Sequence, residues 1–179
     1  MDDPFLIRQT LAGNRDAFRL LVLRHERPVF RFLGLLGFAG PAAEDLAQEA
    51  FLRAYRHLRD FDPARAQFST WLFTLARNLA ANEKERAHHR HEDAASEISD
   101  KADPAPDPLE SAVASEQQGR IAGALGRLPE TLRTAVVLAR MEGFSVEEVA
   151  AIEGCAVGTV KSRIFRAREL LRAALQEEG

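Results

Sequence analysis

The stretch from Ser145 to Arg168 constrains the fold of this chain most, because it specifies two helices and the turn between them. Ser145 is placed to cap the first helix, and Glu148 completes a capping box by reaching back to the Ser145 amide. Gly154 suits the left-handed residue at which a helix ends. Apolar residues recur between these signals at helical spacing: Val146, Val149 and Ile152. The pattern predicts a short helix followed by a tight turn.

The second helix of this pair is basic. Its apolar stripe consists of Val160, Ile164, Ala167 and Leu171. Its other faces carry Thr159, Lys161, Ser162, Arg163, Arg166 and Arg168. A short acidic helix beside a basic one is typical of a helix-turn-helix, whose second helix enters the DNA major groove. There Lys and Arg would contact phosphates, while Thr, Ser and Arg near the helix start would read base edges. The alternative is an ordinary surface hairpin with a solvated basic face.

The rest of the chain predicts an all-α protein of two small helical domains, because no strand or hairpin pattern occurs in its 179 residues. Between residues 92 and 116, eight acidic residues stand against Lys101, with three prolines among them. Such a segment repels itself, which predicts a flexible acidic linker over 93–112. The linker divides a first domain, 1–92, from a second domain, 113–179, which ends in the helix-turn-helix.

Local signals place the remaining helices. In the first domain we expect helices over 4–36, 41–58 and 70–86, and in the second over 113–128 and 129–143. Gly13 and Asn14 should break the first of these, and Pro28 should kink or restart it. Ser69 or Thr70 should cap the helix that begins near residue 70.

Composition limits the class of protein. The formal net charge is −3, so a nucleic-acid binder of this composition must concentrate its positive charge locally. Cys155 is the only cysteine, which excludes an internal disulfide and a zinc site built from several cysteines. No uncharged apolar run is long enough for a signal peptide or a membrane span, so we expect a cytoplasmic protein without membrane insertion. No dimer zipper follows Leu175, which favours a monomer.

The helix predicted over 70–86 carries a second set of residues suited to nucleic acid. Trp71, Asn78 and Asn82 fall on one face, flanked by Arg77 and Arg86. An aromatic ring beside amides and cations is suited to holding unstacked bases and a strand backbone. The alternative is that Trp71 is a residue at the edge of the core.

The helix predicted over 41–58 has a polar face made of Asp45, Gln48, Glu49 and Arg53. Glu49 and Arg53 form a favourable pair at i,i+4 spacing. This face is either solvated or a docking surface for a partner.

The sequence contains no set of residues for catalysis or for a cofactor. His88, His89 and His91 suggest a metal site, but no cysteine or fixed acid completes it, so a frayed helix end is the preferred interpretation. No nucleophile–base pair or phosphate-binding loop is present. We therefore expect a binding protein without a cofactor or a metal, not an enzyme.

Several segments resemble the sigma-70 family of RNA polymerase initiation factors. The segment 44–55, EDLAQEAFLRAY, is similar to the family's second region, and 68–80, FSTWLFTLARNLA, is similar to the helix that follows it. Leu128-Pro-Glu and the segment 158–168, GTVKSRIFRAR, resemble the fourth region. The short chain is similar to the extracytoplasmic-function (ECF) group, which keeps only these two regions.

The resemblance implies a role for each set of residues. The face formed by Asp45, Gln48, Glu49 and Arg53 would dock on the clamp helices of the largest subunit of core RNA polymerase. Trp71, Arg77, Asn78, Asn82 and Arg86 would recognise and open the minus-ten element of promoter DNA. Thr159, Lys161, Ser162, Arg163 and Arg166 would read the minus-thirty-five element. The resemblance further implies control by an anti-sigma factor, in many cases tethered to a membrane.

The sequence departs from the family's pattern at two places, and two other functions remain as alternatives. The segment 83–91 is less rich in Arg than in the family, and Ala156 stands where many relatives cap the recognition helix with Ser. A stand-alone helix-turn-helix regulator would bind a palindrome as a dimer, without polymerase. A metal-sensing protein built around the three histidines would take up metal stoichiometrically.

Overall fold

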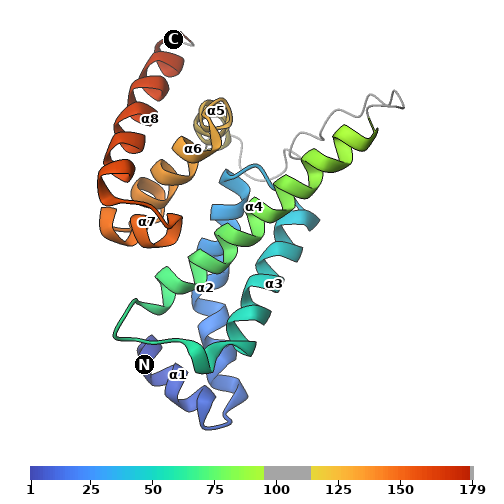
Figure 1. Ribbon diagram of the computed structural model, residues 1–179, viewed down its shortest axis with the longest axis vertical. Coiled ribbons are helices and arrows are strands. Elements are labelled where there is room, and N and C mark those ends of the chain that lie inside the picture. Colours follow the sequence, from blue (N-terminus) through green and yellow to red (C-terminus); the bar gives the residue numbers. More distant parts are fainter. Residues whose placement is uncertain (95–113, 178–179) are drawn as a thin grey trace.

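The computed structural model describes residues 1–94 and 114–177, with side chains over 1–90 and 119–176 (Figure 1). All its longer elements are helices: α1 (Asp3–Leu11), α2 (Arg15–Leu35), α3 (Pro41–Arg56), α4 (Phe68–Ala94), α5 (Ala114–Gly126), α6 (Glu130–Val136), α7 (Val146–Glu153) and α8 (Val157–Glu177). Two single turns, η1 (Leu58–Asp60) and the π-helical η2 (Val137–Met141), complete the described secondary structure. The predicted all-α class is confirmed. The predicted linker, 93–112, lies almost wholly outside the described residues.

Two predictions about local structure differ from the structure. Pro28 does not restart its helix, since α2 runs through it from Arg15 to Leu35, and the alternative that Pro28 kinks the helix stays a prediction. Leu21 on one side of Pro28 and Phe32 on the other are both fully buried, and their packing outweighs the roughly 3 kcal/mol that an internal proline costs. Thr70 does not cap α4, which begins at Phe68. Neither does Ser69, which lies inside the helix.

The N-terminal part of the protein, residues 1–94, is a bundle of α2, α3 and α4 with α1 folded against α2 (Figure 1). Asn14 caps α2, because its side chain accepts hydrogen bonds from the amides of Asp16 at 3.0 Å and Ala17 at 3.3 Å. This cap confirms the helix break predicted at Gly13 and Asn14. α4 is the longest helix, and it extends well beyond the predicted end at residue 86.

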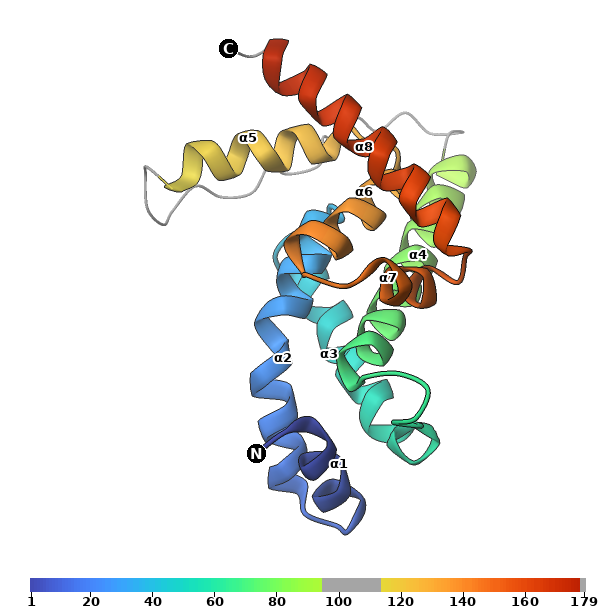
Figure 2. The ribbon, with the colours of Figure 1, turned by 90° about the vertical axis from the view of Figure 1, so that its left-hand side faces the viewer.

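The C-terminal part, residues 114–177, packs against the N-terminal part along α4. Figure 2 shows α7 beside α4, and the two helices are in contact. The Phe73 ring of α4 lies against Phe32 of α2 and against Phe144, just before α7. The buried apolar residues of both parts form one continuous core. The predicted domain boundaries stay a prediction. Within the described residues, no helix is both long enough and apolar enough to cross a membrane.

Candidate nucleic-acid interface

The helix-turn-helix is built as its local signals predict. The Ser145 amide donates to Glu148 Oε2 at 2.8 Å, and the Glu148 amide donates to Ser145 Oγ at 3.1 Å, which completes the capping box. Gly154 ends α7 with φ of 64°, in the left-handed region that only glycine adopts easily. The Cys155 amide then donates to the Ala150 carbonyl at 3.1 Å. These contacts fix the angle at which α8 leaves α7.

α8 presents most of the predicted recognition residues to solvent. Val160, Ile164 and Ala167 are buried against the rest of the C-terminal part, so the opposite side of the helix faces outward. The exposed side carries Thr159, Lys161, Ser162 and Arg166. Phe165 also lies there, 65% exposed, although it was not among the residues predicted from the sequence. Its position outside the apolar stripe of α8 was the signal that it would face solvent.

Arg163 is the exception among the predicted recognition residues, because its guanidinium is held inside the motif. Its Nη1 donates to Glu153 Oε2 and approaches Cys155 Sγ at 3.8 Å. The Arg163 side chain is 24% exposed, whereas that of Glu153 is only 1% exposed. In this arrangement Arg163 joins α7 to α8 and does not extend freely from the exposed side of α8.

Glu153 is a buried acid at the end of α7 that faces two arginines. Arg163 of α8 contacts it from one side, and Arg77 Nε of α4 lies 3.7 Å from its Oε1. Burial raises the pKa of the Glu153 carboxyl, and the charges of Arg163 and Arg77 oppose that rise only in part. In the sequence Glu153 is one acid of an acidic helix, and no local pattern indicates that it is buried.

The predicted minus-ten residues divide between two environments on α4. Asn78, Asn82 and Arg86 are exposed, and Asn78 Oδ1 accepts a hydrogen bond from Arg77 Nη1 at 3.2 Å. Trp71 is half-buried, with its ring centroid 5.2 Å from that of Phe61 and 5.9 Å from that of Phe68. It therefore packs at the edge of the core while keeping part of its ring open. Arg77 is also half-buried, beside Glu153.

The end of α4 carries charged side chains that pair with one another. Glu83 lies within ion-pair distance of Arg86, at 3.8 Å, and of Arg90, at 2.9 Å. His88 and His89 are exposed on this turn, and the side chain of His91 lies outside the described residues. Among the described side chains, no three His, Cys, Asp or Glu residues are arranged to hold a metal ion.

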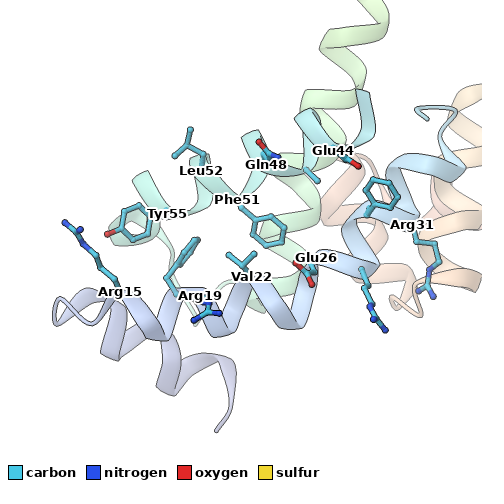
Figure 3. A pocket seen from close by; sticks show the side chains of 14 residues that line it. Arg15, Arg19, Val22, Glu26, Arg31, Glu44, Gln48, Phe51, Leu52 and Tyr55 are labelled. Atoms are coloured by element: carbon cyan, nitrogen blue, oxygen red, sulfur yellow. The ribbon is translucent and has the colours of Figure 1, made fainter. Parts of the chain in front are cut away.

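The predicted docking face on α3 borders an apolar groove that was not predicted from the sequence. Asp45 and Gln48 are exposed, while Arg53 Nε donates to Glu49 Oε1 at 2.7 Å, as their spacing predicts. Of these four residues, Gln48 lines the groove, which runs between α2 and α3 and has a volume of about 960 Å³ (Figure 3). Its apolar lining includes Phe18, Val22, Phe30, Phe51, Leu52 and Tyr55. The sequence could have indicated this groove, because the apolar residues of α2 and α3 cover a wider surface than one buried stripe.

A second, smaller hollow lies within the C-terminal part. Its volume is about 520 Å³, and it is bounded by α5, α6, η2 and α8. Ile121, Met141 and Leu175 line it and are each more than one-third exposed. This surface was not predicted from the sequence either, because its residues come from helices whose packing is set only in three dimensions.

Comparison with known proteins identifies relatives over nearly the whole chain. Residues 21–95 match the family described as Sigma-70 region 2, and residues 118–171 match the family described as Sigma-70, region 4. The chain is 37% identical to the RNA polymerase sigma-H factor of Pseudomonas aeruginosa, covering 97% of this chain and 94% of that protein. It is 36% identical to the ECF RNA polymerase sigma-E factor of Escherichia coli K12, covering 98% and 95% respectively.

Two solved structures have a similar fold. CnrH, in complex with the cytosolic domain of CnrY, is 29% identical, with a TM-score of 0.74 and coverage of 99% of both chains. The sigma factor RpoE from Bartonella quintana, in complex with the anti-sigma factor NepR, is 29% identical, with a TM-score of 0.74. That match covers 89% of this chain and 96% of the other.

Proposed function

This chain belongs to the sigma-70 family of RNA polymerase sigma factors, in its ECF group, and from this membership we propose that it binds core RNA polymerase and directs it to promoters. The observation that carries the proposal is that both matched regions coincide with exposed polar surfaces: the face of α3 and the outward side of α8. The protein acts by binding, and the polymerisation chemistry belongs to the core enzyme.

We propose that α8 reads the minus-thirty-five element. Thr159, Lys161 and Ser162 are exposed in its first turns, where a recognition helix meets base edges and phosphates, and Arg166 follows one turn later. Phe165 adds an exposed aromatic ring suited to apolar contact with thymine methyl groups. Arg163 belongs to this surface only if DNA draws it away from Glu153.

We propose that α4 recognises and opens the minus-ten element. Asn78 and Asn82 offer amides one helical turn apart, and Arg86 extends the same surface toward phosphates. Unstacking a base step costs a few kcal/mol, and stacking on an aromatic ring such as Trp71 returns part of that cost.

Core polymerase docks, in this proposal, on α3 and the adjoining groove. Asp45 and Gln48 supply exposed polar contacts, and the apolar groove supplies buried area next to them. A helical segment of a partner fits such a groove by placing apolar side chains into it while its polar flank meets the rim.

We also propose that an anti-sigma factor controls this protein. The support is that the sigma factor RpoE of B. quintana, which shares its fold, was solved with the anti-sigma factor NepR bound. A partner that covers either the α3 face or α8 blocks a step that initiation requires.

The test is promoter binding and transcription with purified core polymerase. We expect wild-type protein to give specific open complexes on genomic promoter fragments only when core is present. Asp45→Lys should weaken core binding at least tenfold, whereas Glu147→Lys, another exposed acid near a helix start, should not. Tight, sequence-specific binding to a palindrome without core would instead establish an autonomous regulator.

A further inference from the structure

Arg163 lies between two residues of α8 that are proposed to read DNA. Thr159, Arg163 and Arg166 follow one another at intervals of four and three residues, which place them on one side of the helix. Thr159 and Arg166 are both exposed. The guanidinium of Arg163 is instead engaged within the protein, because its Nη1 donates to Glu153 Oε2 at the end of α7. Helical spacing alone therefore counts Arg163 among the reading residues, whereas its contacts do not.

The turn of the helix-turn-helix holds the same nitrogen of Arg163. Its Nη1 also lies 3.8 Å from Cys155 Sγ, which makes a weak additional contact. Glu153 and Cys155 flank Gly154, the left-handed residue at which α7 ends. Two contacts from the turn therefore keep the guanidinium on the α7 side of α8.

The carboxylate of Glu153 depends on Arg163 for compensation of its charge. The Glu153 side chain is almost fully buried, and its second arginine, Arg77 of α4, lies at 3.7 Å from Oε1. Burial raises the pKa of this carboxyl more than the charges of Arg163 and Arg77 lower it. Removal of Arg163 would leave a buried acid with less compensation still, which is strongly unfavourable. A contact between Arg163 and DNA is therefore offset by the cost of uncovering Glu153.

We propose that Glu153 determines the DNA specificity of α8, because it withholds Arg163 from the promoter and leaves the minus-thirty-five element to the other predicted residues of the helix. Glu153 acts through Arg163 without touching DNA, so it is a positioning residue. A released arginine at this place would favour guanine, with which arginine forms paired hydrogen bonds in the major groove. This inference rests on the proposed function of α8 and narrows the set of residues that read DNA.

The first experiment tests the contact in the full-length protein, without polymerase or DNA. NMR of isotope-labelled protein distinguishes a guanidinium that a carboxylate holds, whose rotation is slow, from one that rotates freely in solvent. We expect the signals of Arg163, assigned through Arg163→Gln, to report slow rotation in the wild type and fast rotation in Glu153→Leu. Glu147→Leu, the same substitution at an exposed site of α7, should leave them unchanged. Fast rotation in the wild type would overturn the proposal.

The second experiment measures the affinity of holoenzyme, assembled from core polymerase and full-length protein, for a promoter fragment that the wild type opens. Arg163→Gln is introduced into both the wild type and Glu153→Leu, because its amide can still donate to Glu153 and spares the buried acid. We expect it to weaken binding at least about fivefold more in Glu153→Leu, where Arg163 is free to contact DNA. An equal or larger loss in the wild-type background would overturn the proposal.

A fragment library randomised over the minus-thirty-five element then measures what the released Arg163 reads. Glu153→Leu holoenzyme should prefer guanine at one position at least about fivefold more than Glu147→Leu holoenzyme does. Glu153→Leu also removes the partner of Arg77, so the double variant with Arg163→Gln is needed to assign the effect. Loss of the guanine preference in that variant would assign it to Arg163. A gain in affinity that is equal for all sequences would overturn the role of Glu153 in specificity.

Circular dichroism verifies that every variant keeps its helical content, so that a change in DNA binding reports the contact and not unfolding. A contact that NMR confirms, without any gained preference in Glu153→Leu, would make Glu153 a purely structural residue and overturn the proposal. Failure of wild-type holoenzyme to open promoter fragments would refute the proposed function in a separate assay, and the NMR result does not depend on it.

Discussion

Phe73 of α4 and Phe144, the residue before the cap of α7, meet edge to face with ring centroids 4.8 Å apart and an interplanar angle of 65°. The Phe73 ring also lies 5.2 Å from that of Phe32 of α2, centroid to centroid. Phe73 therefore joins the core of the N-terminal bundle to the C-terminal part through aromatic contacts.

Replacing Phe73 with alanine should be strongly destabilising. Phe73 is only 2% exposed, so truncation removes a buried ring and leaves a cavity between Phe32 and Phe144. We expect the free energy of unfolding, measured by urea denaturation, to fall by about 3–5 kcal/mol. The matched control is Phe165→Ala, whose ring is 65% exposed and whose loss should change stability by less than about 0.5 kcal/mol. Equal effects of the two substitutions would contradict this packing role of Phe73.

Gly154 should not tolerate a side chain. Its φ of 64° is unfavourable for other residues, so Gly154→Ala should lower the free energy of unfolding by about 1–2 kcal/mol. Gly158 lies inside α8, and a methyl group added to its Cα would point into open space, so Gly158→Ala should raise stability by about 0.5–1 kcal/mol. Thermal unfolding of both variants checks the opposite signs, and destabilisation by both would argue against this account of the turn.

Ala156 leaves α8 without a side-chain cap. Its carbonyl accepts from the Thr159 amide at 2.9 Å and from the Val160 amide at 3.2 Å, but alanine has no oxygen for the free amides of the first turn. Because Ala156 is exposed, Ala156→Ser should raise the free energy of unfolding by about 1 kcal/mol. Ala151→Ser, on an exposed interior position of α7, should give no gain. A gain of similar size there would mean that the effect is not capping.

The buried Glu153 should give the protein a measurable pH dependence. Its pKa in the folded state is raised above the ordinary value of 4.5, chiefly by burial, so the folded protein binds this proton more readily than the unfolded chain does. Relative to Glu153→Gln, the wild-type protein should therefore gain stability as pH falls through the raised pKa. The gain should be complete below 4.5 and lost as pH rises.

The measurement is the difference in unfolding free energy between wild type and Glu153→Gln across the range from pH 7 to pH 4. Taking the difference cancels the titration of all other groups that the substitution leaves unaffected. Glu147→Gln, on an exposed site, provides the control series, and its difference from wild type should vary little with pH. A wild-type protein that loses stability relative to Glu153→Gln on acidification would reverse the inferred sign.

The sequence by itself determined the features that depend on neighbouring residues. The capping box of Ser145 and Glu148, the left-handed Gly154 and the pair of Glu49 and Arg53 each join atoms within a few positions of one another. The outward side of α8 followed from its apolar stripe, because helical periodicity fixes which residues share a face. Motifs on these helices were enough to identify the family.

The tertiary structure alone decided which charges are buried and which helices meet. The sequence predicts that Pro28 kinks or restarts its helix, yet α2 is continuous through it, with buried residues on both sides. Glu153 reads as one acid on a solvated helix, but α4 covers it and brings Arg77 beside it. Such contacts join residues far apart along the chain, and their energies depend on burial and distance that no local pattern encodes. The sequence therefore predicted the residues of the proposed recognition surfaces, and the folded structure determined that two of the predicted arginines, Arg77 and Arg163, share one buried carboxylate.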